Sequence, residues 1–381
     1  MVFSDNGIIK KAQEAANKTQ EAVENEQAQI NDLTSELMEI LGENPRLTDI
    51  YVFLYNDGTL TFGTQNEPIE GKTVVKEYGN IKGKEYTAWI DENNNFVTDT
   101  PWFNDRTLIT KVSIVDEIVP LSMASWFNGC VNLTEFENLE RLDTSEVENM
   151  EAMFAYCSSL TSLEVSSFNT SNVTNMTNMF YNCTNLTEII GLEKFNTSNV
   201  ENMVSMFAHC SSLTSLNLSG FDTRNVISMF NIFWDCKNLT EIIGLEEFHT
   251  DKLENMRSMF ADCSSLTRVN LSSFDTSNVI SMNNMFVGCT NLTEITGLEQ
   301  FNTSNVEDMG GMFARCSRLT SLDLSSFDIS NVINMGSMFL DSTNLTVIYV
   351  GDNWDLSNVE NTSNMFGGCG TTTTTPKENS L

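Results

Sequence analysis

The sequence predicts an α/β repeat protein in which short coils stack into a solenoid. Three observations lead to this prediction. Cysteines recur at intervals of 26 and 27 residues, a Met-Phe pair precedes most of them, and a leucine-rich strand pattern follows. A unit of this length cannot bury its own apolar face, so neighbouring units have to complete the core by stacking.

The N-terminal segment, residues 1–42, is expected to be a single amphipathic helix over residues 5–42. Apolar residues recur there every seven positions, which is half of a coiled-coil seam. They are Ile9, Ala16, Val23, Ile30 and Leu37. The seam could pack on the rest of the chain, or it could mediate self-association through residues 5–42. Both readings stay open at this point.

Residues 43–106 are expected to form a small, mainly β module. Its clearest signal is YVFLYNDGTLTFG at 51–63, two β-rich runs around Asn56-Asp57-Gly58, which is typical of a hairpin. Residues 107–130 then cap the first coil. Nine repeats fill residues 131–369, and residues 370–381 are a Thr-rich polar tail.

One repeat shows how a coil is built. LTSLEV at 160–165 has the L-x-x-L-x-L pattern and is short enough for a strand. FNTSNV at 168–173 is rich in residues that favour turns. Val173, Met176, Met179 and Phe180 then follow at spacings of three, three and one, which predicts one apolar face of a short helix. The 26- and 27-residue units alternate, so a 53-residue pair is the expected unit of duplication.

The Met and Cys residues are expected to pack rather than to bind metal. They keep the same register in every repeat, yet Ile232 replaces one Met and Ser342 replaces one Cys. A soft-metal site would not tolerate these exchanges, whereas a core would. A column of reduced, buried thiols is the preferred reading, with scattered disulfides or a metal as open alternatives. We therefore expect no cofactor, no metal site and no catalytic residue, that is, a protein that is not an enzyme.

The composition limits the class of partner. The formal net charge is −32, which argues against nucleic acid and against anionic lipid head groups. No run of 18 apolar residues is present, so we expect membrane contact only through an anchor that lies outside this sequence.

The strand segments supply the candidate binding residues. Side chains between the inward-facing leucines of each strand are expected to line an exposed sheet. This row is mostly polar and mildly acidic. It contains Glu164, Glu188, Asn217, Glu241, Arg268, Asn270, Glu294, Asp323 and Tyr349.

The repeat CSSLTSLEVSSFNTSNVTNMTNMFYNC at 157–183 resembles the BspA-like, DUF285-type repeat of bacterial surface proteins. The resemblance covers residues 107–369 and implies a leucine-rich-repeat-like solenoid on the bacterial cell surface, associated with adhesion. Residues 4–33 resemble, less specifically, the segment after the hydrophobic anchor of clostridial pilin-like surface proteins.

Two functions follow as hypotheses. The first is a non-enzymatic, extracellular binding or adhesion module that recognises protein or glycan ligands at the cell surface or in the host matrix. The second is a structural surface protein, a stalk, coat or pilin-like filament subunit, that assembles through the N-terminal helix.

Overall fold

A computed structural model describes residues 44, 46–90 and 96–376. The chain divides after Leu47, and the following concerns the unit Thr48–Leu381. The expected N-terminal helix at 5–42 lies outside the described residues.

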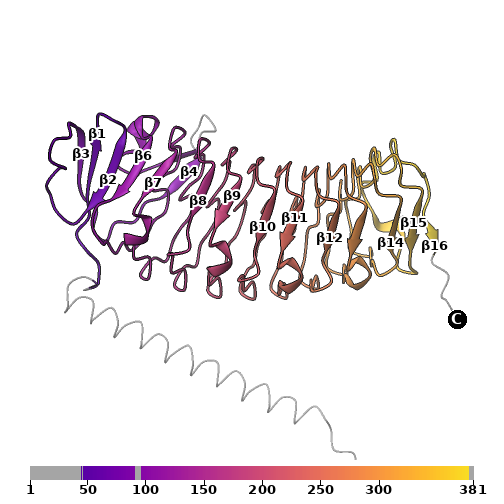
Figure 1. Cartoon of the computed structure of the whole chain (residues 1–381). Coiled ribbons are helices and arrows are strands. Elements are labelled where there is room, and N and C mark those ends of the chain that lie inside the picture. The colour runs from indigo at the N-terminus through magenta and orange to yellow at the C-terminus, as the bar shows by residue number, and fades with distance from the viewer. Residues whose placement is uncertain (1–43, 45, 91–95, 377–381) are drawn as a thin grey trace, which may run out of the picture. The chain divides into compact units, whose positions relative to one another are not determined.

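A five-stranded sheet begins this unit, in the order β3-β1-β2-β6-β7 (Figure 1). Strands β1 (Tyr51–Tyr55) and β2 (Thr59–Gly63) form the expected antiparallel hairpin. Gly58 adopts a left-handed conformation in the turn, with φ of 82°. Strand β3 (Val74–Asn80) pairs with β1.

The same sheet continues into the first coils. Strand β2 pairs in parallel with β6 (Lys111–Ile114), and β6 pairs with β7 (Glu135–Glu137). The mainly β segment therefore shares its sheet with the solenoid, and β2 pairs with the outer edge of β6. A second, short hairpin joins β4 (Ala88–Ile90) and β5 (Phe96–Thr98), and the 3₁₀ helix η1 (Phe103–Leu108) follows.

The strands of the solenoid lie side by side along one face (Figure 1). They pair in parallel as β8-β9, β10-β11, β12-β13 and β14-β15-β16. These strands are β8 (Ser162–Glu164), β9 (Glu188–Ile190), β10 (Ser215–Asn217), β11 (Glu241–Ile243), β12 (Arg268–Asn270), β13 (Glu294–Thr296), β14 (Ser321–Leu324), β15 (Val347–Val350) and β16 (Thr375–Pro376). From β8 to β15, the two strands of each pair belong to one 53-residue unit. The strand pairing therefore has the same period as the duplication that the cysteine spacing indicated.

In three of the 27-residue units the extra residue is a glycine that follows the strand, and in the first unit Asn138 holds this place. Gly191, Gly244 and Gly297 have φ between 88° and 98°, a region that favours glycine. A Cβ on Gly191 would lie 2.5 Å from the Ser166 backbone of the preceding coil. One turn of 3₁₀ helix follows each glycine, in η3 (Leu192–Lys194), η4 (Leu245–Glu247) and η5 (Leu298–Gln300); η2 (Leu139–Arg141) and η6 (Leu356–Asn358) occupy similar places.

The expected short helix around the Met-Phe pair is wrong. Residues 176–183 form successive β-turns, with Asn178 and Asn182 left-handed at φ of 56° and 59°. Inside the coil, the Met179 N–H donates to the Met176 carbonyl at 3.2 Å and the Cys183 N–H to the Phe180 carbonyl at 3.2 Å. These i to i−3 bonds close turns and do not continue into an α-helix.

The N–H groups between those turn bonds point to the next coil. Met176, Asn178, Phe180 and Asn182 donate to carbonyls of residues 202, 204, 206 and 208 over 2.8–3.0 Å. Successive backbone N–H groups thus alternate between a hydrogen bond within the turn and a hydrogen bond to the neighbouring coil. The same pattern recurs along the solenoid, so the turns stack as regularly as the strands do.

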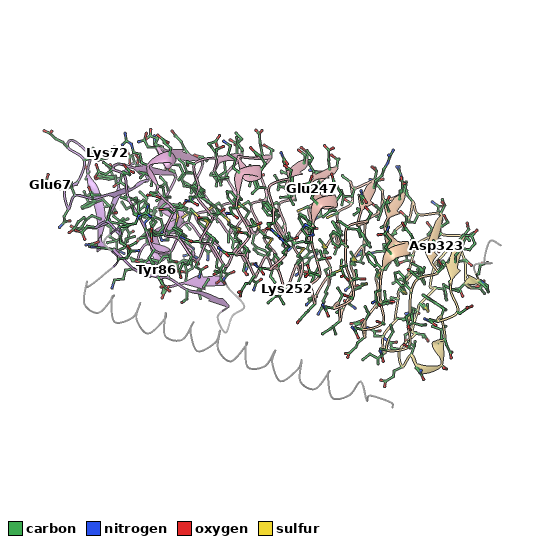
Figure 2. The ribbon with its side chains drawn as sticks, turned by 90° about the horizontal axis from the view of Figure 1, so that it is seen from below. Glu67, Lys72, Tyr86, Glu247, Lys252 and Asp323 are labelled. Carbon is green, nitrogen blue, oxygen red and sulfur yellow. The ribbon has the colours of Figure 1, made fainter. Side chains whose placement is uncertain are left out.

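The buried columns confirm that Met, Phe and Cys pack in the core. Both Met columns are buried, and Ile232 is as buried as the Met residues around it. Phe154, Phe180 and Phe207 stack with centroids 5.6 Å apart and rings within 5° of parallel. Each such buried side chain contributes about 1.5–3 kcal/mol relative to exposure. Side chains fill the space inside the coils, and charged ones such as Glu247 and Lys252 lie outside (Figure 2).

A column of threonines, which the sequence analysis did not single out, also joins the coils. Thr197 donates its hydroxyl proton to the Asp222 carbonyl at 2.9 Å and accepts the Asp222 N–H at 2.8 Å. Seven threonines occupy this buried position: Thr144, Thr170, Thr197, Thr223, Thr250, Thr276 and Thr303.

The cysteine column makes a repeated hydrogen bond. The Cys183 thiol donates to the Phe154 carbonyl of the preceding coil at 3.0 Å, and Cys210 donates to Phe180 at the same distance. Ser342 makes the equivalent bond to Phe313 at 2.6 Å. A small, weakly polar donor satisfies this position, which explains why serine can replace cysteine there.

We predict that most of these thiols are unreactive in the folded protein. Burial raises the pKa of Cys183 to about 12, and a thiol that is neutral and enclosed is a poor nucleophile. With a chromogenic disulfide reagent at pH 8, half-buried Cys369 should react first and the eight buried cysteines only after unfolding. All nine should react in denaturant without reductant. A smaller final number would reveal disulfides, and rapid reaction of all nine in the native state would contradict the buried column.

Candidate functional site

The strand face is the surface formed by the outward side chains of β8 to β15. Inward residues such as Leu163 and Leu216 are buried, and the residues on either side of them point outward because side chains alternate along a strand. The structure places eight of the nine candidate residues at exposed positions and Asp323 at a half-buried one. The binding role of these residues remains a proposal.

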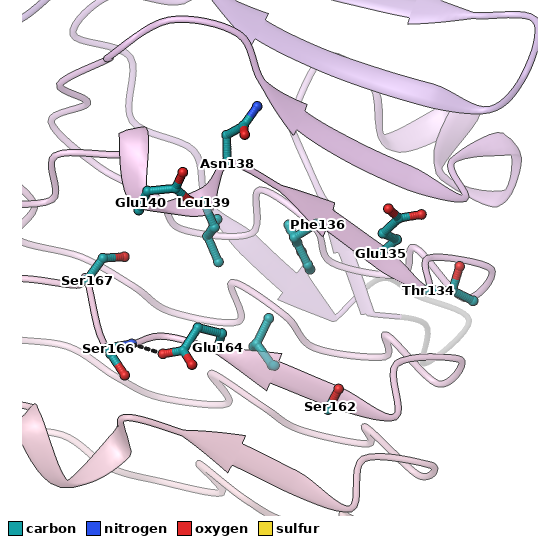
Figure 3. A pocket seen from close by; sticks show the side chains of 11 residues that line it. Thr134, Glu135, Phe136, Asn138, Leu139, Glu140, Ser162, Glu164, Ser166 and Ser167 are labelled. Atoms are coloured by element: carbon teal, nitrogen blue, oxygen red, sulfur yellow. Dashed lines mark hydrogen bonds between the residues drawn. The ribbon is translucent and has the colours of Figure 1, made fainter.

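Two hollows lie where neighbouring strands belong to different sheets. The first has a volume of about 510 Å³ and lies between β7 and β8 (Figure 3). Phe136, Leu139 and Leu163 supply its apolar surface, and Glu135, Glu140 and Glu164 supply carboxylates. The strand face is therefore interrupted by acidic grooves at sheet boundaries.

Glu164 is the one candidate residue in this first hollow. Its carboxylate accepts the Ser166 N–H at 2.9 Å (Figure 3). Hydrogen bonds from the Ser166 hydroxyl and N–H lower the pKa of Glu164, because they stabilise its charged form. The group is thus ionised and held in place, ready to accept a hydrogen bond or to pair with a cation.

The second hollow, of about 620 Å³, lies at the boundary between β11 and β12. It brings together four candidate residues, Glu241, Arg268, Asn270 and Glu294. The Arg268 Nε lies 3.8 Å from a Glu294 carboxylate oxygen, and both side chains are well exposed. A long, exposed pair of this kind contributes little to stability, so both groups remain available to a partner.

The other candidates are distributed along the strand face. Glu188, Asn217, Asp323 and Tyr349 line neither of these two hollows. The spacing of the repeats predicted which residues share a face. It could not indicate which of them meet, because the grooves depend on the breaks between strand pairs.

A second surface carries the aromatic side chains that the sequence analysis missed. We call it the turn face; it comprises the residues just before the Met, just after the Phe and just before the Cys of each coil. Tyr156, Tyr181, His209 and Trp234 follow one another there, with ring centroids 5.3, 5.4 and 4.3 Å apart. All four are half-buried.

Two kinds of coil alternate on the turn face. The residue after the Phe is Ala in one kind and larger in most of the other: Ala155, Tyr181, Ala208, Trp234, Ala261, Val287, Ala314 and Leu340 in succession. This variation at one position of an otherwise uniform repeat is the sequence feature that could have indicated a functional surface here.

The part of the chain that the structure describes lacks two features. No described helix is long and apolar enough to cross a membrane. Across residues 46–90 and 96–376, no group of three His, Cys, Asp or Glu side chains is arranged to hold a metal ion.

The coils and their exposed strand face define a leucine-rich-repeat-like solenoid protein. The family model described as "Mycoplasma protein of unknown function, DUF285" matches residues 121–246, 161–269, 212–318 and 254–378. These overlapping matches span well over half of the 381 residues. The chain belongs to the DUF285 family.

The chain is also similar to solved leucine-rich repeat proteins. One from Eubacterium ventriosum is 14% identical, with a TM-score of 0.34 and coverage of 86% of this chain and 95% of the other. One from Bacteroides ovatus is 16% identical, with a TM-score of 0.31 and coverage of 88% and 100%. One from T. pallidum is 18% identical, with a TM-score of 0.19 and coverage of 71% and 87%. No curated protein matches the chain in sequence.

Proposed function

We propose that this protein is a non-enzymatic binding module of the bacterial cell surface, exposed to the extracellular medium. Its solenoid would recognise protein or glycan ligands through the strand face. The observation that carries the proposal is the hollow between β11 and β12, which gathers four exposed polar residues on rigid strands. Position-specific polar groups on a rigid surface favour recognition because little ordering is needed on binding.

The charge of the hollow indicates the kind of ligand group that fits. Glu241 and Glu294 flank Arg268, so the lining is acidic overall, with one cation beside it. A ligand with a basic group opposite the glutamates and a hydrogen-bond acceptor opposite Arg268 would match this arrangement.

We predict that reversing the acidic charges weakens this recognition. The full chain is tested for saturable binding to immobilised matrix proteins, serum proteins and glycans. The double variant Glu241→Lys, Glu294→Lys should weaken binding at least about tenfold, because exposed cations would then face the ligand's basic group. Glu307→Lys makes the same kind of change outside the strands and should bind as the native chain does.

Binding that survives the double reversal would move the site away from the strand face. An absence of saturable binding across the whole panel would contradict the binding proposal itself.

A structural role is the second proposal. The buried columns and the row of Asn, Ser and Asp bridges from Asn149 to Asn361 continue through the coils with little change, which is what a spacer requires. In this reading, self-association through residues 5–42 would build a stalk, coat or filament.

The structural proposal predicts an assembled state that depends on the N-terminal segment. Light scattering and electron microscopy should show oligomers or filaments of the full chain, and deletion of residues 1–45 should abolish them. A monomeric full chain at high concentration would contradict this role and leave the binding role unaffected.

A further inference from the structure

The turn face carries a hollow of about 460 Å³ with an unusual lining. Trp234, Phe230 and Val287 supply apolar walls, and Ala261 and buried Ser258 lie between them. Parallel coils stack about 4.8 Å apart, so two coils leave roughly 10 Å between the backbones of Trp234 and Val287. Because the intervening residue is Ala261, this interval has room for one flat ring.

Trp234 is held from the side of the preceding coil. The His209 ring lies 4.3 Å from the indole, centroid to centroid, and its Nδ1 lies 3.0 Å from an Asp235 carboxylate oxygen. The Lys237 ammonium approaches the other Asp235 oxygen at 3.1 Å. These contacts fix the indole before any ligand arrives, which lowers the entropic cost of stacking on it.

The far rim of the hollow is a preformed ion pair. The Arg315 guanidinium lies 3.3 Å from the Asp262 carboxylate, although the two residues are two coils apart. Gly288 lies in the coil between them, and a Cβ there would come within 2.1 Å of that carboxylate oxygen. The missing side chain at Gly288 therefore permits the pair to form beside the hollow.

A second cation also lines the hollow. The Arg257 guanidinium lies 5.5 Å from the centroid of the Phe230 ring and is exposed. Asn231 and Asn284 also line the hollow. The rim thus offers amide, carboxylate and guanidinium groups, both hydrogen-bond donors and acceptors, around the aromatic rings of Trp234 and Phe230.

We propose that this hollow is a carbohydrate-binding site in which one sugar ring stacks on Trp234 and its hydroxyl groups bond to the rim. A sugar ring has an apolar C–H face and an edge of hydroxyls, which matches an indole wall surrounded by Asn, Asp and Arg. This site is separate from the strand face, so it goes beyond the function proposed above and does not depend on it.

Other occupants fit the lining less well. An apolar side chain from a protein partner would fill the hollow but would remove water from the polar rim without supplying hydrogen bonds, which costs free energy. A polyanion such as nucleic acid would be repelled by a chain of net charge −32. An uncharged or singly charged sugar avoids both penalties.

The test uses the full chain and an array of oligosaccharides that end in galactose, N-acetylglucosamine, mannose, fucose or sialic acid. Each positive sugar is then titrated while intrinsic tryptophan fluorescence is recorded. We expect saturable binding of at least one sugar. Trp234→Ala should weaken it at least about tenfold, and Trp234→Phe, which keeps a flat ring, should retain most of it.

A second variant blocks the site without removing the indole. Ala261→Tyr places a ring in the space between Trp234 and Val287. Tyrosine occurs at the corresponding position of the other kind of coil, as Tyr181 between Ala155 and Ala208. The variant should abolish sugar binding while the circular dichroism spectrum stays native. Tyr349→Ala on the strand face is the matched control and should bind sugar normally.

Three results would overturn the proposal: no sugar bound by the native chain, binding unchanged in both Trp234→Ala and Ala261→Tyr, or binding lost in Tyr349→Ala. The first result leaves protein recognition by the strand face intact, and the last would assign the sugar to that face. The outcomes for the two surfaces can therefore be told apart.

Discussion

The whole solenoid depends on backbone hydrogen bonds that run from one coil to the next across the turns. Alternate N–H groups of the Met-Phe segment close β-turns, and those between them donate to the following coil. Left-handed residues such as Asn178 and Asn182 lie within these turns and accompany this alternation. Without it, a coil this short would leave many of its backbone groups unpaired inside the protein.

This constraint separates an invariant interior from a variable exterior. The stacked backbone fixes the spacing of the Phe, Met, Cys and Thr columns, so each column accepts only residues of matching size or hydrogen-bonding capacity; Ile232 and Ser342 are examples. Side chains outside the coils have no such restriction. The strand face and the turn face can therefore carry different recognition chemistry on the same scaffold.

Much of the fold could be predicted from short sequence motifs. The strand motif, the hairpin at Asn56-Asp57-Gly58 and the buried columns each follow from a pattern of a few neighbouring residues. The helix prediction failed because spacings of three, three and one suit successive β-turns as well as a helical turn. Only contacts between coils decide between them. For the same reason the sequence placed the nine candidate residues on one face but did not reveal the hollows, and it passed over Trp234, whose neighbours come from other coils.

The most direct test of this account is an NMR experiment that detects couplings through hydrogen bonds in the deuterated full chain. The Asn178 N–H donates to the Val204 carbonyl at 2.9 Å, so a correlation from the Asn178 amide nitrogen to the Val204 carbonyl carbon is predicted. A correlation to the Thr174 carbonyl carbon instead would show an α-helix in this segment and contradict stacking of the coils through their turns.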